Sequence, residues 1–220
     1  YSKEVFFSSG IHHHYGMEKF TPGFERGYFE ELLATSGADL AKDVVDLMFD
    51  PTIDPIKVSL DPTKDLVLAS AVNFYGEDVN QKEVEDFYAA MEVEGDTSPV
   101  SYGLNSRIVR GKDGKLEEQV WRVGGMYDGA LREVVKWLEL AKRVAESPEQ
   151  AAVIDLLIQY YNTGDLRKWD EFNIAWVALK PGAVDFIQGF VEVYNDPMGK
   201  RGSYESVVEI IDPEATRNMS

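Results

Sequence analysis

The feature that most constrains the fold is an alternating run that reverses across a Gly-rich turn. Residues 104–110 alternate in polarity, residues 111–114 read Gly-Lys-Asp-Gly, and residues 115–123 alternate again. A period of two is typical of a half-buried strand, and a four-residue Gly/Asp connection favours a β-hairpin. The sequence therefore predicts a pair of antiparallel strands in the middle of the chain.

Helical and extended patterns are mixed around this hairpin. The spacing of apolar residues predicts helices over residues 28–33, 40–49, 81–91, 128–146, 148–161 and 165–178, and extended segments over 1–7, 66–72, 186–194 and 204–211. Because strands and helices do not alternate strictly, an α+β fold is favoured over a doubly wound sheet.

The charge of the chain narrows the choice of partners. Lys and Arg total 22 against 39 Asp and Glu, which gives a net charge of −17. An acidic surface repels phosphate, so neither nucleic acid nor an anionic membrane is expected as a partner. A cationic group, such as the free amino end of a peptide, is favoured instead.

The chain has no cysteine, which excludes disulfides, thiol catalysis and thiolate metal sites and fits a cytoplasmic location. No apolar run approaches the length of a membrane span of about 18 residues. The first residue is Tyr1 and the opening stretch does not resemble a signal peptide. We therefore expect a piece of a longer protein, from which a signal or lipoprotein segment could have been lost.

The only histidines are the adjacent His12, His13 and His14. Alternate side chains of a strand point to opposite sides, so three neighbours do not converge on one metal, and we expect no metal site. A His-rich tag is the other interpretation, although the flanking residues look native. No His-Glu-x-x-His zinc motif, Gly-x-Ser-x-Gly elbow or P-loop occurs in the chain.

Glu192 and Tyr194 form the most informative pair. On a strand, residues two apart face the same side, which would place a carboxylate beside a phenol. A carboxylate can pair with a peptide ammonium, and a phenol can donate to a carbonyl oxygen that gains charge. The pair is equally compatible with a Tyr beside a Glu on an edge strand, with residues 196–199 forming only a turn.

Residues 190–202, which read F-V-E-V-Y-N-D-P-M-G-K-R-G, resemble the signature of the dipeptidyl peptidase III family of zinc exopeptidases. Residues 73–76, the hairpin and residues 160–165 resemble family features in the same order, and residues 10–15 resemble the bacterial members. The likeness extends over nearly the whole chain, and its most specific part is residues 192–202.

The resemblance implies a two-lobed enzyme that releases dipeptides from the N-terminus of oligopeptides. Residues 1–220 would be its lower, substrate-binding lobe, with mixed helices and a small β-barrel or antiparallel sheet. By the same comparison, Glu192 binds the free amino group of the substrate and Tyr194 polarises the scissile carbonyl. The strand at residues 192–195 pairs with the extended peptide, and Asn195 contributes through its backbone.

In the family the zinc motif lies in a helical upper lobe, downstream of the residues that correspond to 196–199. The resemblance therefore implies zinc in the parent protein, none in this chain, and no hydrolysis by this chain alone. The upper lobe of the same polypeptide and oligopeptides are the expected partners. The alternative from another class is a standalone, non-catalytic module that binds peptides or proteins.

Overall fold

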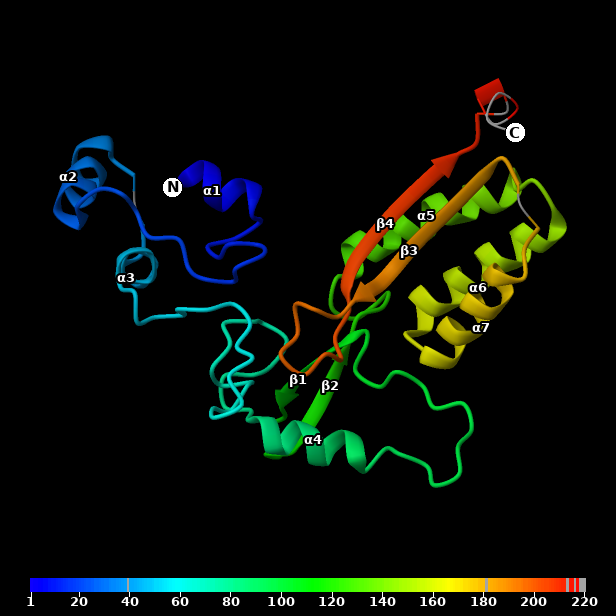
Figure 1. Ribbon diagram of the computed structural model, residues 1–220, viewed down its shortest axis with the longest axis horizontal. Helices are drawn as coiled ribbons and strands as arrows, with labels where there is room; N and C mark the ends of the chain where they lie inside the picture. Colours follow the sequence, from blue (N-terminus) through cyan, green and yellow to red (C-terminus); the bar gives the residue numbers. More distant parts are fainter. Residues whose placement is uncertain (39, 181, 213, 216, 218–220) are drawn as a thin grey trace. The chain divides into compact units, whose positions relative to one another are not determined.

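The computed structural model describes residues 1–38, 40–180, 182–212, 214, 215 and 217. The described chain forms two compact units, Tyr1–Asn73 and Phe74–Ser220. Both contain helices, and the strands that pair into sheets lie in the second unit (Figure 1). The predicted α+β class is confirmed.

In its described residues, the first unit holds three helices, α1 (Ser2–Phe7), α2 (Arg26–Ser36) and α3 (Lys42–Phe49). The Lys19 ammonium donates to the carbonyl oxygens of Leu47, at 3.0 Å, and of Asp50. These carbonyls lie at the C-terminal end of α3, where a helix leaves its last acceptors unsatisfied and favours positive charge.

The predicted extended segment at residues 1–7 is wrong, because these residues form α1. The amide of Val5 donates to the Tyr1 carbonyl at 3.0 Å, and that of Ser8 to the Glu4 carbonyl at 2.9 Å. An extended segment needs a partner strand for these groups, whereas a helical turn satisfies them locally.

The predicted strand at residues 66–72 is also wrong. The Asp65 carboxylate accepts from the backbone amides of Val67 and Leu68, at 3.0 and 2.9 Å. The amide of Ala69 then donates to the Asp65 carbonyl at 2.9 Å. Local bonding to an Asp side chain competes with a sheet ladder, and here it produces turns.

The second unit combines four helices with two antiparallel two-stranded sheets in its described part. Its elements are α4 (Gln81–Ala89), β1 (Ser106–Arg110), β2 (Leu116–Val120), α5 (Asp128–Arg143), α6 (Pro148–Thr163), α7 (Leu166–Val177), β3 (Val184–Glu192) and β4 (Ser203–Ile210). The predicted hairpin is confirmed as β1–β2, with Ser106 opposite Val120 and Arg110 opposite Leu116.

Capping residues explain where the helices of the second unit begin and end. Asn80 accepts from the third amide of α4 in a capping box. Ser147 caps α6 with Pro148 as its first residue, and Gly164 ends that helix at φ 72°, a conformation that glycine adopts without strain. Asp165, the residue after Gly164, caps α7. The two helices α6 and α7 are therefore joined by a tight turn, and they pack side by side.

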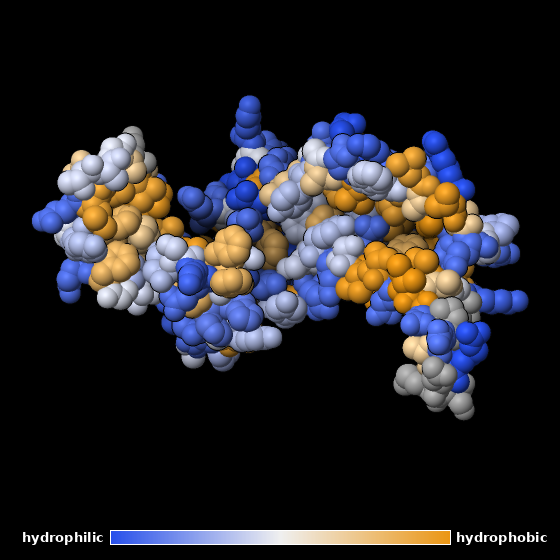
Figure 2. Space-filling view, turned by 90° about the horizontal axis from the view of Figure 1, so that it is seen from above, coloured by the Kyte–Doolittle hydropathy of each residue, from blue (hydrophilic) through white to orange (hydrophobic). Residues whose placement is uncertain are grey.

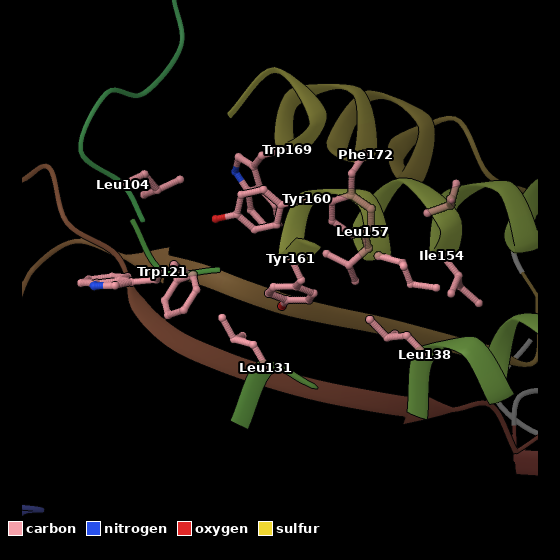
Figure 3. Close-up of a cluster of buried hydrophobic side chains, with 13 residues drawn as sticks. Leu104, Trp121, Leu131, Leu138, Ile154, Leu157, Tyr160, Tyr161, Trp169 and Phe172 are labelled. Atoms are coloured by element: carbon pink, nitrogen blue, oxygen red, sulfur yellow. The ribbon is translucent and has the colours of Figure 1, made fainter. Parts of the chain in front are cut away.

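The main core lies between β3, β4 and the three helices α5, α6 and α7 (Figure 3). The Tyr160 and Trp169 rings lie 5.0 Å apart, and Trp169 stacks on Phe172 at 5.3 Å. Gly189 of β3 is required here, because an added Cβ would lie 2.5 Å from the Trp169 ring. Aromatic packing thus anchors β3 against α7.

The outer part of β4 is not covered by the described residues. Val207, Val208 and Ile210 are exposed, and Figure 2 shows hydrophobic residues exposed among hydrophilic ones on the face that it draws.

No described helix is both long and apolar enough to cross a membrane.

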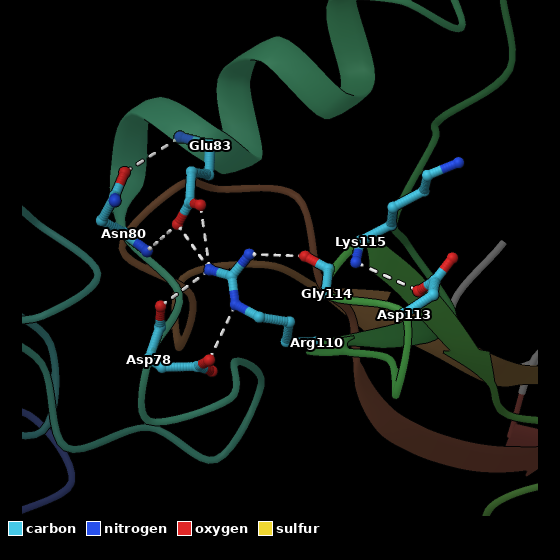
Figure 4. Close-up of polar contacts among 7 residues, drawn as sticks. All are labelled: Asp78, Asn80, Glu83, Arg110, Asp113, Gly114 and Lys115. Carbon is cyan, nitrogen blue, oxygen red and sulfur yellow. Dashed lines mark hydrogen bonds and ion pairs between the residues drawn. The ribbon is translucent and has the colours of Figure 1, made fainter.

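An arginine fork joins the first hairpin to α4 (Figure 4). Arg110 Nε donates to Asp78 at 2.7 Å, and its Nη2 donates to both Glu83 oxygens at 2.9 and 3.0 Å. Nη1 reaches the Gly114 carbonyl at 3.1 Å. Because Glu83 also completes the capping box with Asn80, one guanidinium fixes the start of α4 relative to the hairpin turn.

Candidate functional site

The strand that carries the predicted site ends at Glu192, two residues earlier than expected. Tyr194 therefore lies in a turn rather than in β3. Val191 and Val193 pack against the core, while Glu192 is exposed and Tyr194 keeps 61% of its surface accessible. The two predicted site residues thus stay on the solvent side of the chain, and no bond joins them directly.

A β-bulge sets the geometry of this end of the strand. Phe190 pairs with Tyr204 and Glu192 with Ser203, which leaves Val191 as the extra residue. Just before β4, a Cβ added to Gly202 would lie 2.5 Å from the Phe190 carbonyl carbon. The backbones meet at the bulge because residue 202 has no side chain.

The Asn195 side chain also forms a bond within the loop. Its side-chain amide donates to Ser203 Oγ at 3.1 Å. This bond crosses from the turn after β3 to the first residue of β4, so it holds the two ends of the loop together.

The Asp196 carboxylate organises the turn that follows. The carboxylate is buried and accepts the Tyr75 hydroxyl at 2.6 Å. It also accepts backbone amides from Met198 at 3.3 Å, from Lys200 at 2.8 Å and from Arg201 at 2.9 Å. Residues 196–199 are therefore more than a plain turn: the segment wraps around a buried anion.

Arg201 is completely buried and balances this anion. Its Nη1 donates to the Tyr75 hydroxyl at 3.0 Å, and its Nη2 donates to the Tyr88 hydroxyl at 2.5 Å. Nη1 lies 3.8 Å from the Asp196 carboxylate, and the guanidinium carbon lies 4.5 Å from the centre of the Tyr75 ring. A buried charge needs this density of partners to be tolerated.

The network continues to the first hairpin. Tyr88 donates to Glu118 at 2.8 Å, and Ser106 donates to the same oxygen at 2.6 Å. Burial raises the pKa of both Tyr75 and Tyr88 well above the ordinary value of 10.0, although the Arg201 charge opposes the rise. Both phenols therefore stay protonated at neutral pH and serve as donors.

The central members of this network, Asp196, Arg201, Tyr75 and Tyr88, are buried beneath the loop that carries Glu192 and Tyr194. Glu192 and Tyr194 project outward from a loop whose buried side is held by Asp196 and Arg201. Sequence reasoning did not identify Tyr88 or Glu118, because nothing in their neighbourhood marks a buried partner. For Tyr75, the only signal was the resemblance of residues 73–76 to the family.

The described residues do not form a zinc site. Among them, no three His, Asp or Glu side chains gather closely enough to hold a metal. His12 donates from Nε2 to the Asp54 carbonyl at 2.8 Å, and His13 accepts the Gly16 amide on Nδ1 at 2.9 Å. Zinc requires three or four converging ligands, which this donor set does not supply.

Comparison with known proteins identifies the family. A family model described as "Peptidase family M49" matches residues 73–220, which is more than half of the chain. The chain belongs to this peptidase family. The match covers the second unit and includes Glu192, Tyr194 and the buried network beneath them.

Curated relatives agree with this assignment. Dipeptidyl peptidase 3 of Nematostella vectensis is 33% identical over 88 residues, which cover 40% of the chain and 12% of that protein. Dipeptidyl peptidase 3 of Homo sapiens is 27% identical over 135 residues, 55% of the chain and 18% of that protein. The matched parts thus span less than a fifth of these relatives' lengths.

Solved structures share the fold. The structure of DPP III from Caldithrix abyssi matches with a TM-score of 0.52 and 21% sequence identity. The match covers 88% of this chain and 36% of the Caldithrix chain. The structure of dipeptidyl-peptidase III from Corallococcus sp. strain EGB matches with a TM-score of 0.50 and 21% sequence identity. That match covers 67% of this chain and 26% of the Corallococcus chain.

Proposed function

We propose that this chain is the peptide-binding lobe of a zinc dipeptidyl peptidase that removes dipeptides from the N-terminus of oligopeptides. The zinc belongs to a helical lobe elsewhere in the same polypeptide, and the protein acts in the cytoplasm. In this proposal residues 1–220 form one lobe, which binds the peptide but does not hydrolyse it.

The observation that carries the proposal is the exposure of Glu192 and Tyr194 on a loop anchored by a buried ion pair. Catalytic and binding groups require rigid support, and the Asp196–Arg201 network provides it within the part of the chain that matches the family. The family membership supports a peptide as the ligand of the exposed pair.

Glu192 would bind the peptide ammonium, because an exposed carboxylate at a strand end can accept charge-assisted hydrogen bonds from its N–H groups. Tyr194 would donate its hydroxyl to the scissile carbonyl as negative charge develops there. Among the described residues, β4 is the only strand paired with β3. At the start of β3, side chains of Glu146 and Gln150 bond the Val184 backbone on the second edge. In the proposal, the other end of that edge takes the extended peptide, alongside Glu192 and, through its backbone, Asn195.

The test is hydrolysis of dipeptidyl arylamides by the longer polypeptide that carries this chain. Glu192→Gln is expected to raise KM by about tenfold or more, as loss of a charged hydrogen bond does. Tyr194→Phe is expected to lower kcat by about 100-fold, as loss of an oxyanion donor does. Exposed residues of the same types serve as controls in Glu209→Gln and Tyr28→Phe.

Unchanged kinetics in both site variants would remove Glu192 and Tyr194 from the site. A protein that binds peptides but never hydrolyses them, even with zinc, would favour the standalone binding module.

A further inference from the structure

A groove lies beside the C-terminal end of β3 and has no part in the proposed peptide site. Its volume is about 730 Å³, and it is lined by Val191 and Val193 but by neither Glu192 nor Tyr194. This volume lies within the range of small-molecule sites, about 300–1,000 Å³. The groove is thus a separate candidate site.

Apolar side chains of the core form the floor of the groove. Trp169 and Phe190 belong to the buried core, and Leu104, Val191 and Val193 extend the same surface. Such a surface favours the aromatic or aliphatic body of a ligand, because binding removes apolar area from water.

One wall is a loop, residues 92–102, that is tied to α7. Arg167 Nη2 pairs with Asp96 at 2.8 Å, and Arg167 also donates to the Ser98 carbonyl. This tether holds the wall near α7 without a ligand, and it neutralises the one carboxylate of the groove that is partly buried. The other lining carboxylate, Glu92, is exposed and therefore solvated.

Lys200 supplies the polar group of the groove. Its backbone amide is bonded to Asp196 at 2.8 Å, which fixes its position, and its ammonium lies 5.2 Å from the centre of the Tyr88 ring. In the part of the chain that the structure describes, no carboxylate lies within ion-pair distance of this ammonium. Lys200 is half-buried, and its ammonium, which lies over the Tyr88 ring, is free to pair with an anion.

We infer that this groove binds a monocarboxylate with an aromatic or aliphatic body. The body fills the floor made by Trp169 and Phe190, and the carboxylate pairs with Lys200. A single negative charge is favoured over a polyanion, because Glu92 and Asp96 also line the groove. The site stands apart from the proposed peptidase role and does not depend on it.

The test is calorimetric titration of the protein with hydrocinnamate and with its neutral amide, hydrocinnamamide. Hydrocinnamate is expected to bind with a dissociation constant of about 1 mM or below, and the amide about tenfold more weakly. Raising the salt concentration should weaken binding of the acid and leave the amide unchanged.

Lys200→Met keeps the apolar stem and removes the charge, so it should weaken hydrocinnamate binding by about tenfold and leave the amide unaffected. Lys200→Arg should keep affinity for the acid within about threefold. The matched control is Lys136→Met, since Lys136 also lies over an aromatic ring, that of Trp137 at 5.6 Å, but outside the groove. The urea midpoint of each variant shows that it is folded.

Equal affinity for acid and amide, the same loss in the Lys200→Met and Lys136→Met variants, or no binding of the acid at millimolar concentration would each overturn the inference. N-acetylphenylalanine distinguishes two sources of the same carboxylate chemistry. If it binds as well as hydrocinnamate, the groove accepts a peptide C-terminus; if only hydrocinnamate binds, the ligand is a free acid.

Discussion

The hydroxyl of Tyr75 donates to the buried carboxylate of Asp196 at 2.6 Å, although 121 residues separate them in the chain. The same hydroxyl accepts from Arg201 at 3.0 Å. One phenol therefore bridges the two members of a buried ion pair. Through this bridge, the segment before α4 holds the loop that presents Glu192 and Tyr194.

Removing the guanidinium should destabilise the protein strongly. Arg201→Met leaves Asp196 without its counter-charge, which should cost about 3–5 kcal/mol of unfolding free energy. Tyr75→Phe removes one bond to a charged group and should cost about 1.5–3 kcal/mol. Arg132→Met, which breaks an exposed pair with Asp128, should cost about 0.5 kcal/mol or less. Urea unfolding measures all three, and equal small losses would contradict a structural role for the buried pair.

Two glycines, Gly189 in β3 and Gly202 just before β4, should not tolerate a methyl group. Gly202→Ala would place its Cβ against the Phe190 backbone, and Gly189→Ala against the Trp169 ring. Each should cost about 1–3 kcal/mol, as overpacking does. Gly129→Ala is the control, because that helical position has open space around it, and it should stabilise by about 0.5–1 kcal/mol.

The Gly202→Ala variant should also lower peptidase activity in the longer polypeptide, since it displaces the bulge beside Glu192. Thermal or urea unfolding gives the stabilities of the three variants. A Gly202→Ala protein as stable as the Gly129→Ala protein would show that the close approach at the bulge is not required.

Buried tyrosines should make the protein sensitive to alkali. Burial raises the pKa of Tyr75, Tyr88, Tyr160 and Tyr161 in the folded state above the unfolded value of 10.0. The stability that these groups contribute is fully present below pH 10.0 and is lost as the pH rises above it, because only the unfolded chain can then ionise them.

In a titration followed by tyrosinate absorbance, these four should ionise together with unfolding. In the Tyr88→Phe variant this step should be smaller. A single step for all tyrosines in the folded protein would contradict the burial of these hydroxyls.

Residues 1–220 should bind no stoichiometric zinc. The described residues lack three converging ligands, and structural zinc requires such a set. Metal analysis after dialysis should find well below one zinc per chain, and the His13→Ala variant should give the same result. One tightly bound zinc per chain that is lost in this variant would overturn the prediction.

The local sequence determined most of the helices and the first hairpin. Asn80, Ser147 and Asp165 each precede a helical pattern and cap the helix that follows. Such caps can be read from the local sequence, because capping depends on residues only two or three positions apart. The resemblance of residues 190–202 was likewise readable from the sequence, and the family match confirms it.

Only the tertiary structure decided which residues of that segment are buried and which partners they bond. The signature Asp196 and Arg201 are buried against Tyr75 and Tyr88, more than 100 residues earlier. The strand ends at Glu192, just after the bulge at Val191, so Tyr194 lies in a turn and not on the strand expected from its spacing. Periodicity and capping are short-range properties, whereas burial of a charge depends on which distant elements supply its partners. The sequence alone therefore indicated the segment, and packing between distant elements determined which of its residues support the loop and which face solvent.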